Sequence, residues 1–451
     1  MKPLGWFGIF RIGLVQTALG SIVVLTTSTL NRVMVVELGL AAMLPGALVA
    51  LHYAVQVSRP RLGYGSDLGG RRTPWIIGGM AVLGVGGIAA SCATAWMATD
   101  PVAGAALAAL AFLLIGVGVG AAGTSLLVLL AKRVTPERRA PAATTVWLMM
   151  IAGFAVTAGV AGHFLDPFSM PRLVTVTSVV CGAAFLLTLV AIRNLEGSGS
   201  SASAAAAADA ADAAAVDEEP GPPFRHALAE VWSESRARRF SIFVFVSMLA
   251  YSGQELIVEP FAGTVFGLTP GQSTQLAGVQ NTGMLVGMIL VAVGARRFGT
   301  LRGWTIGGCI ASAIALVTLA AGGFFADEWP LRASVFALGM ANGAFAVAAI
   351  GSMMALVAAG RERREGVRMG LWGAAQAVAF GAGGFLGTMG VDVMRSLVSL
   401  PATAYGAVFA SQAVMFLVAT VLAARVGHTE AHGTETPRAG PVRLATETGR
   451  Q

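Results

Sequence analysis

Charged residues are scarce in this chain of 451 residues. Aspartate, glutamate, lysine and arginine together make up 12% of it, whereas apolar residues make up 55% and the mean hydropathy is +0.73. A soluble domain carries about twice that share of charge. A chain of this composition cannot cover its surface with groups that water solvates. The composition therefore predicts a polytopic membrane protein and argues against a soluble enzyme or binding module.

Cysteine is also rare, with three residues at Cys92, Cys181 and Cys309. All three lie inside apolar segments. We therefore expect free thiols that pack as small hydrophobic groups, rather than disulfides or a metal site.

The motifs of common catalytic sites are missing as well. The sequence has no phosphate-binding loop, no zinc-ligand spacing and no nucleophile elbow. Residues 118–123 match the pattern Gly-x-Gly-x-x-Gly, but they lie inside an apolar segment instead of between a strand and a helix. Small residues there, and at Gly383 and Gly387, are expected to let helices cross closely. The chain is predicted to be no enzyme.

Long apolar segments dominate what is present. A bilayer is crossed by about 20 residues of helix. Segments of that length predict twelve spans, at roughly 12–36, 41–60, 74–96, 103–131, 142–165, 173–193, 240–262, 272–294, 303–325, 332–359, 369–391 and 402–424.

The basic residues predict the orientation of these spans. If the first residues lie in the cytoplasm, all but four of the 30 lysines and arginines fall on the cytoplasmic side. The exceptions are Arg32, Arg172, Arg332 and Arg395. Cytoplasmic loops of membrane proteins are rich in lysine and arginine, so we expect both termini in the cytoplasm. The net charge of +7 then reflects sidedness and predicts no nucleic-acid partner.

One segment between the sixth and seventh predicted spans differs from the rest. Residues 197–223 are rich in alanine and serine and then acidic, and such a segment cannot bury a core. We predict an N-terminal six-helix half at 1–196, a largely disordered cytoplasmic linker at 197–239, a C-terminal six-helix half at 240–425 and a disordered cytoplasmic tail at 426–451.

The two predicted halves repeat one another in sequence. Trp75-Ile-Ile-Gly-Gly79 opens the third span, and Trp304-Thr-Ile-Gly-Gly308 opens the ninth. Glu137-Arg-Arg139 follows the fourth span, and Glu362-Arg-Arg364 follows the tenth. Duplicated halves are typical of secondary transporters. The predicted fold is therefore all-α, with twelve transmembrane helices in two six-helix pseudo-repeats.

Polar side chains inside the predicted spans are costly to bury, so each needs a reason. One interpretation is that Arg32 pairs with a carboxylate on the facing helix and locks the halves together. The other is that these groups line a substrate path or a proton-linked gate, with Glu255, the deepest carboxylate, as the titrating group. The side chains concerned are Asn31, Arg32, Glu37, Gln254, Glu255, Glu259, Gln280, Asn281 and Gln376. For the pairing we expect Glu37, Glu255 and Glu259 as partners of Arg32, in that order.

A glycine-rich charged turn lies between the second and third predicted spans, at Gly63, Asp67, Gly70, Arg71 and Arg72. The spacing resembles the loop signature Gly-x-x-x-Asp-Arg-x-Gly-Arg-Arg of the major facilitator superfamily. Leu68 departs from the usual arginine. The resemblance implies the fold of that superfamily, with Asp67 stabilising one state of the bundle. Without it, the loop is a charged turn of any membrane protein.

Three further stretches resemble the PucC family, a branch of the major facilitator superfamily in phototrophic bacteria. They are residues 29–38, residues 63–67 and residues 351–377. Members of that family assist the assembly of light-harvesting complexes by handling bacteriochlorophyll. The opening residues 1–8 resemble a branch labelled as a bacteriochlorophyll synthase subunit, although the aspartate-rich motifs of prenyl-transferring enzymes are absent.

The resemblance implies a ligand, partners and a location. The ligand would be bacteriochlorophyll or a precursor. The partners would be the lipid bilayer, light-harvesting polypeptides or the reaction-centre complex, and bacteriochlorophyll synthase. The location would be the bacterial inner (intracytoplasmic) membrane.

Two histidines fall inside predicted spans, His52 and His163. Each either packs in the bundle or ligates the magnesium of a chlorophyll-type ring, since a neutral imidazole suits such a site. His52 is the better placed of the two, because Gln56 follows one helical turn later and can orient the imidazole.

Three functions remain open from the sequence. The first is a non-enzymatic assembly factor that binds or delivers bacteriochlorophyll. The second is a proton-coupled secondary transporter of a small solute, and the third is an accessory subunit of bacteriochlorophyll synthesis.

Overall fold

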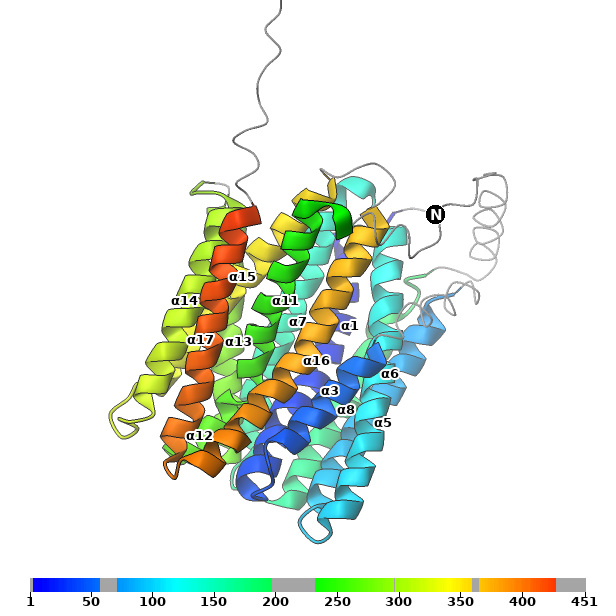
Figure 1. Cartoon of the computed structure of the whole chain (residues 1–451). Coiled ribbons are helices and arrows are strands. Elements are labelled where there is room, and N and C mark those ends of the chain that lie inside the picture. Colours follow the sequence, from blue (N-terminus) through cyan, green and yellow to red (C-terminus); the bar gives the residue numbers. More distant parts are fainter. Residues whose placement is uncertain (1–2, 57–70, 197–231, 296, 359–364, 427–451) are drawn as a thin grey trace, which may run out of the picture.

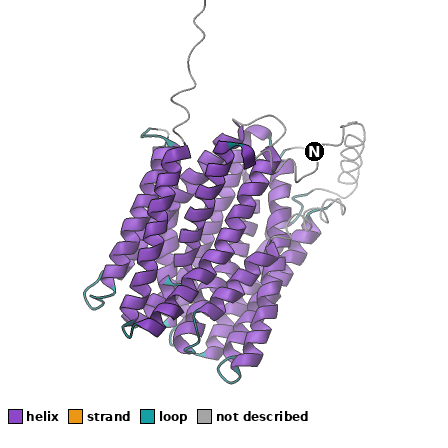
Figure 2. Cartoon of the chain, viewed as in Figure 1, coloured by secondary structure: helices purple, strands orange, loops and turns teal. Residues whose placement is uncertain are grey.

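The computed structural model describes residues 3–56, 71–196, 232–295, 297–358 and 365–426. Within these ranges every regular element is a helix (Figure 2). The motif-loop residues Gly63, Asp67 and Gly70, most of the predicted linker and nearly all of the predicted tail lie outside the described residues.

The helices run alongside one another in one bundle (Figure 1). The first is continuous from Trp6 to Glu37 and consists of α1 (Trp6–Val24), η1 (Leu25–Thr29), α2 (Leu30–Arg32) and η2 (Val33–Glu37). The remaining ones are α3 (Met43–Val55), α5 (Thr73–Trp96), α6 (Pro101–Arg133), α7 (Pro136–Leu165), α8 (Met170–Ile192), α11 (Ser235–Glu255), α12 (Val258–Phe266), α13 (Pro270–Gly294), α14 (Leu301–Gly322), α15 (Leu331–Ala358), α16 (Glu365–Leu397) and α17 (Pro401–Val426).

Eleven of the described helices are long and apolar enough to cross a membrane, so the chain is a multi-pass membrane protein. The second predicted span corresponds to α3, whose described part has 13 residues and ends just before residues 57–70. The seventh predicted span begins earlier than expected, because α11 starts at Ser235 inside the predicted linker. Several helices begin at a side-chain cap; Asp100 and Thr269 accept backbone N–H bonds at the starts of α6 and α13.

Two arginines make hydrogen bonds between helix ends at one end of the bundle. Arg11 near the start of α1 donates to the carbonyl oxygen of Ala191 at the end of α8, and Arg302 at the start of α14 donates to that of Ala424 at the end of α17. The start of α1 and the end of α17 lie at the same end of the bundle, which we call the terminal end (Figure 1). The opposite end, where η2 and α12 lie, is called the far end.

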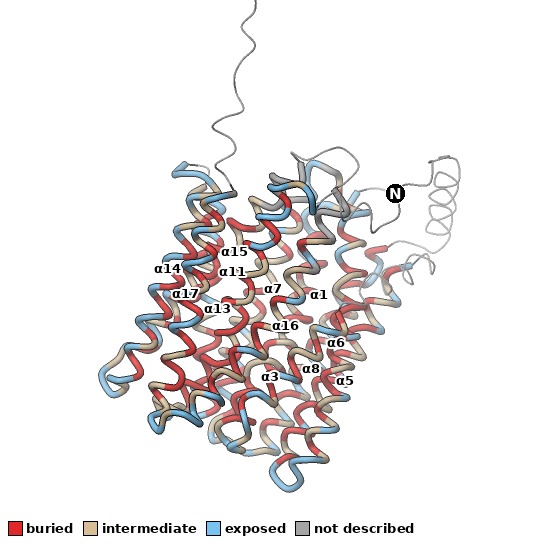
Figure 3. The backbone as a smooth tube through the Cα atoms, viewed as in Figure 1, coloured by how far each residue is buried: buried red, intermediate tan, exposed pale blue. Residues whose placement is uncertain are grey.

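Buried residues recur along the helices of the bundle (Figure 3). The largest clusters of buried apolar side chains divide along the chain. One large cluster of buried apolar side chains draws all its members from residues 240–423. Two others draw theirs from residues 9–195, with Leu256 as the one exception. Across this division, α13 packs along α7 and α16 packs along α3.

Glycines permit the closest helix crossings, as the sequence predicted. A Cβ atom added at Gly118 would lie 2.6 Å from the backbone nitrogen of Leu83, and one at Gly387 would lie 2.4 Å from the carbonyl oxygen of Gly253. No side chain fits such gaps. The three cysteines are free thiols; Cys181 and Cys309 are buried as expected, whereas Cys92 is exposed.

Candidate functional site

The first helix changes its pitch twice near the far end. The backbone N–H of Leu30 bonds to the carbonyl of Leu25, and that of Leu38 bonds to the carbonyl of Val33 at 3.0 Å. Both bonds span five residues, which marks π-helical turns, and such turns are frequent at functional sites. The polar residues from Ser28 to Arg32 lie in and between these turns and contact the second half of the chain.

The seventh span is broken between α11 and α12, and Pro260 explains the break. A proline ring clashes with the carbonyl four residues earlier and cannot donate a hydrogen bond to it. That carbonyl belongs to Leu256, where α11 has just ended. The side chain of Asn31 supplies the missing donor, with Nδ2 at 2.5 Å from the Leu256 oxygen. Asn31 thus closes a backbone gap in the opposite half.

Arg32 is 2% exposed and forms an ion pair with Glu37, the first of the three predicted partners. Its Nη2 also donates to the carbonyl oxygen of Leu268 at 2.6 Å. Gly263 on α12 lies against the guanidinium, and a Cβ there would come within 3.0 Å of it. The ion pair thus lies within one helix, and the interpretation that it is made to the facing helix is wrong. The hydrogen bond to Leu268 is what connects Arg32 to the second half.

Two further contacts join the same helices. Ser28 donates to the carboxylate of Glu259, which is 3% exposed, and the hydroxyl groups of Thr29 and Thr274 lie 3.1 Å apart. Ser28, Thr29, Asn31 and Arg32 therefore each make one contact with residues 256–274 of the second half.

At the far end, two aspartates each accept hydrogen bonds from the start of a helix in the other half. Asp392 on α16 accepts backbone N–H bonds from Ala42 and Met43 at the start of α3, at 2.9 and 2.7 Å. Asp166 at the end of α7 accepts the hydroxyl of Thr269 at the start of α13, at 2.9 Å. A carboxylate at a helix N-terminus is stabilising. We call Asp166 and Asp392 the aspartate clasp. Asp166 connects α7 to α13, and Asp392 connects α16 to α3.

Arg32, Glu37, Asp166, Gly263 and Thr269 line one recess of about 780 Å³ at the far end. The ion pair and one arm of the aspartate clasp therefore share a single cleft between the halves.

Deeper in the bundle, aromatic rings from both halves meet. The ring centroid of Phe380 on α16 lies 5.4 Å from that of Tyr53 on α3 and 5.6 Å from that of Tyr251 on α11. Glu255 and Gln376 are half-buried one turn from this aromatic cluster, on α11 and α16. The arrangement combines a flat apolar surface with two polar groups.

His52 lies beside this cluster. Its ring meets that of Tyr53 edge to face at 4.9 Å, and its Nε2 is 2.7 Å from Nε2 of Gln56, the predicted neighbour. His52 is buried, whereas His163 is exposed near the far end of α7 and contacts Phe164.

No described contact joins the other predicted polar residues to residues 28–32 or to the aromatic cluster. Gln254 is fully buried, and neither atom of its amide has a hydrogen-bond partner among the described residues. Asn281 bonds to its own helix at Ala277, and Gln280 is half-buried. Of the motif loop, Arg71 is exposed and Arg72 is buried. Glu196 accepts the backbone N–H groups of Arg72 and Thr73 at the start of α5, a contact that sequence reasoning missed.

The bond from Asn31 to the broken helix gives a first prediction. Asn31→Leu leaves the buried Leu256 carbonyl without this donor and should lower the free energy of unfolding by about 1–3 kcal/mol. In a Pro260→Ala background the restored backbone N–H can reach Leu256, so the same change should cost less than about 1 kcal/mol. Unfolding in mixed micelles measures both values. Equal costs in the two backgrounds would contradict this explanation of the break.

Comparison with known proteins shows the family to which the chain belongs. The family described as "PUCC protein" matches residues 29–431. The chain is 50% identical over 426 residues to "Bacteriochlorophyll synthase 44.5 kDa chain" of Rhodobacter capsulatus, covering 94% of this chain and 96% of that one. It is 29% identical to "Protein PucC" of Cereibacter sphaeroides, covering 92% and 91%.

Solved structures show the fold. The nucleoside transporter NupG matches with a TM-score of 0.66 at 13% identity, over 93% of this chain and 100% of that one. A peptide transporter, POT, matches with a TM-score of 0.66 at 15% identity, over 95% and 97%. The chain thus has the predicted fold of the major facilitator superfamily, and it belongs to the PucC family.

Proposed function

We infer that this protein is a non-enzymatic membrane assembly factor that binds bacteriochlorophyll or a precursor and delivers it to light-harvesting polypeptides or the reaction-centre complex. The supporting observation is the aromatic cluster of Tyr53, Tyr251 and Phe380 between the halves. Flat rings stack favourably on a planar macrocycle. His52 lies directly beside them and supplies an imidazole suited to magnesium.

The relatives supply the pigment class. The name of the relative at 50% identity refers to bacteriochlorophyll, and other relatives are PucC proteins. The distribution of arginines supports a bacterial inner-membrane protein whose terminal end faces the cytoplasm.

A proton-coupled secondary transporter is the second candidate. The fold is that of NupG and POT, and the carboxylates of Glu255 and Glu259 lie inside the membrane-spanning helices. An accessory role in bacteriochlorophyll synthesis is the third, because the relative at 50% identity is named as a synthase chain.

Deletion of the gene in a pigment-making host separates these functions. An assembly factor leaves pigment synthesis intact, so we expect assembled antenna complexes to fall while free bacteriochlorophyll or its precursors accumulate. Absorption spectra of membranes and of solvent extracts measure both. A fall in total pigment at the last biosynthetic step would support the synthesis role instead, and unchanged antenna levels would refute delivery.

His52 gives a sharper prediction about the pigment site. The amide of Gln56 lies at Nε2 of His52, so ligation of magnesium through Nε2 requires that amide to move. We expect His52→Phe to lower bound pigment per protein and to shift its absorption band. We expect Gln56→Leu to raise bound pigment, because it removes the competing amide.

His163→Phe is the matched control, because that histidine is exposed and lies near the far end. Pigment content that is the same in all three variants would mean that His52 only packs in the bundle. The ligand would then be another group.

A further inference from the structure

Glu255 borders the space between the halves beside the aromatic cluster. From 252 to 263 in the seventh span every residue is buried except Glu255, which is half-buried. Tyr251 lies one turn earlier on the same face of α11 and is half-buried as well. The carboxyl group of Glu255 acts electrostatically on the hydroxyl of Tyr251. Since the ring centroid of Tyr251 lies 5.6 Å from that of Phe380, all three side chains border one space.

Gln376 adds a second polar group on the other side of the aromatic cluster. It is half-buried and lies one turn before Phe380 on α16. Because α11 and α16 both run from the terminal end to the far end, Glu255 lies on the far-end side of the rings and Gln376 on the terminal side (Figure 1). One turn in each direction separates the two residues by about 12 Å along the bundle. A ligand the size of a chlorin macrocycle can therefore contact both.

No basic side chain of the described residues is placed to balance a further carboxylate beside Glu255. Glu255 makes no ion pair with any of them, and Arg32 directs its guanidinium to Glu37 and to the carbonyl oxygen of Leu268. The other lysines and arginines of the described helices lie within two turns of where their helices reach the terminal end or the far end. His52 is the remaining candidate, and an imidazole that ligates magnesium is neutral.

A second carboxylate in this space would be repelled by that of Glu255. Two like charges about 8 Å apart, at an effective dielectric constant of about 20, repel strongly enough to weaken binding about thirtyfold. A neutral ester in the same place carries no charge and escapes this repulsion. Glu255 can therefore distinguish a carboxylic acid from its ester.

We propose that Glu255 makes this site selective for pigment whose propionate group is esterified, over the free-acid form of the same macrocycle. The macrocycle lies against the aromatic cluster, its ester group faces Glu255, and one of its ring carbonyls accepts an amide N–H of Gln376. This inference rests on the proposed function. It deepens that function by naming the form of the pigment that is carried.

The selectivity gives the protein a place in a reaction sequence. Its ligand is the product of a prenyl transfer, in which the propionate oxygen bonds to the isoprenyl carbon of an isoprenyl diphosphate and diphosphate leaves. A protein that disfavours the free acid acts after this step. Selectivity for the ester thus argues for delivery of the pigment rather than for a part in its synthesis.

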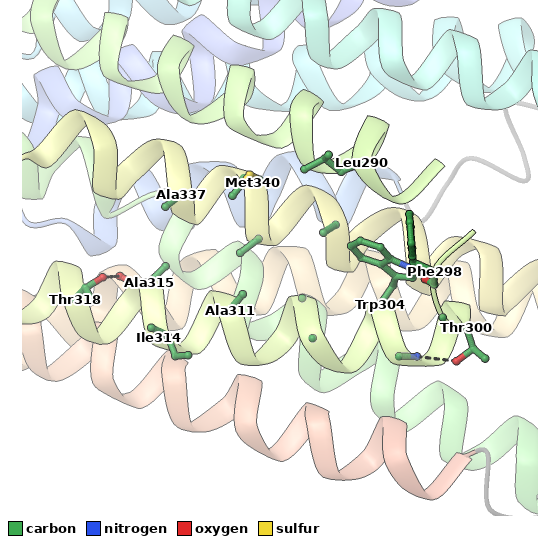
Figure 4. Close-up of a pocket in the computed structure, with 16 residues that line it drawn as sticks. Leu290, Phe298, Thr300, Trp304, Ala311, Ile314, Ala315, Thr318, Ala337 and Met340 are labelled. Carbon is green, nitrogen blue, oxygen red and sulfur yellow. Dashed lines mark hydrogen bonds between the residues drawn. The ribbon is translucent and has the colours of Figure 1, made fainter. Parts of the chain in front are cut away.

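The groove between α14 and α15 offers no such selectivity (Figure 4). It has a volume of about 700 Å³, and none of the described residues that line it is charged. The acyl chains of the bilayer fit such a surface. Selection by charge therefore belongs to Glu255 and not to this groove.

The test compares bacteriochlorophyllide with its methyl ester, which share the macrocycle, lack the long tail and differ in charge. Each is titrated into full-length protein in phosphatidylcholine nanodiscs, binding is followed by absorption, and empty nanodiscs correct for partition into the bilayer. We expect the wild type to bind the ester about thirtyfold more tightly than the acid. Glu255→Gln removes the charge, so this ratio should fall about tenfold, and the cost of desolvating the acid accounts for the remainder.

Two further variants complete the experiment. Glu255→Asp keeps the charge and should keep most of the wild-type ratio. Glu328→Gln is the matched control, because Glu328 is exposed at the far end and its replacement changes the net charge equally. It should leave the ratio unchanged, and thermal unfolding shows whether each variant is folded.

Equal binding of acid and ester by the wild type would overturn the selectivity and leave the proposed function standing. A ratio that Glu255→Gln leaves unchanged, or that Glu328→Gln lowers equally, would likewise overturn the role of Glu255. Tighter binding of the acid would overturn it and support the role in synthesis. If neither ligand binds, and bacteriochlorophyll itself does not bind, both proposals are refuted.

Discussion

Replacing Asp166 and Asp392 together by alanine is expected to open the far end of the bundle. The two carboxylates make three hydrogen bonds to the starts of α3 and α13, and all three connect one half of the chain to the other. Hydrogen bonds to a charged group are worth about 1.5–3 kcal/mol when buried, and about 1 kcal/mol each is reasonable at this half-exposed position. The sum of about 3 kcal/mol corresponds to about a hundredfold change in the closed-to-open ratio.

A single reporter cysteine measures this opening. Thr274 is 1% exposed between the halves, so Thr274→Cys in a background without native cysteines should react slowly with a membrane-impermeant maleimide. The clasp variant should raise that rate about a hundredfold if opening limits labelling.

Asp100→Ala is the control for this experiment, because Asp100 caps α6 within its own half. It should leave the labelling rate near that of the parent. A clasp variant that labels no faster than the control would show that the halves are held together by other contacts.

The second large effect is expected from Glu37→Gln, which removes the ion-pair partner of the buried Arg32. Breaking a buried ion pair from one side costs about 3–5 kcal/mol. Glu37 is 33% exposed, so the lower end of that range, about 3 kcal/mol, applies. The loss should appear as a lower free energy of unfolding in mixed micelles.

Removing both charges should restore much of that stability. In the double variant Arg32→Met with Glu37→Gln neither member of the ion pair is charged, and well-packed apolar replacements of buried ion pairs are often neutral. Glu328→Gln, an exposed acid at the same end, should change stability by less than about 0.5 kcal/mol. If Glu37→Gln behaves like Glu328→Gln, the bilayer surface or water already neutralises Arg32.

Hydropathy located the spans, because burial in lipid requires long apolar helices. The Arg32–Glu37 pair could also be predicted, since both residues lie at the end of one span. The aspartate clasp was not foreseen. Asp166 and Asp392 each follow or end a span, as acidic residues at helix ends commonly do, and their partners are helix starts about 100 and 350 positions away. The donors to Asp392 are backbone N–H groups, which have no signature in the sequence, and the Thr269 hydroxyl that binds Asp166 belongs to an ordinary helix cap. Only the packed structure identifies such partners.

Of two other features, the break in the seventh span could have been predicted and the π-helical turns could not. Pro260 was a signal for the break in the seventh span, because its ring cannot lie over the carbonyl of Leu256 in a continuous helix. The π-helical turns beside Arg32 had no comparable signal, since residues 25–37 contain neither glycine nor proline. These turns lie beside the contacts that Asn31 and Ser28 make with the second half.

The most direct test of the proposed function is the colour of the purified protein. Full-length chain isolated from a pigment-making host should carry bacteriochlorophyll or a precursor in a ratio approaching one or more per chain. Its absorption band should differ from that of the free pigment in the same detergent, and Phe380→Leu should reduce the bound amount while Phe324→Leu, an exposed ring, should not. A colourless protein that is folded and monodisperse, or bound pigment with the spectrum of free pigment and no response to Phe380→Leu, would contradict pigment handling.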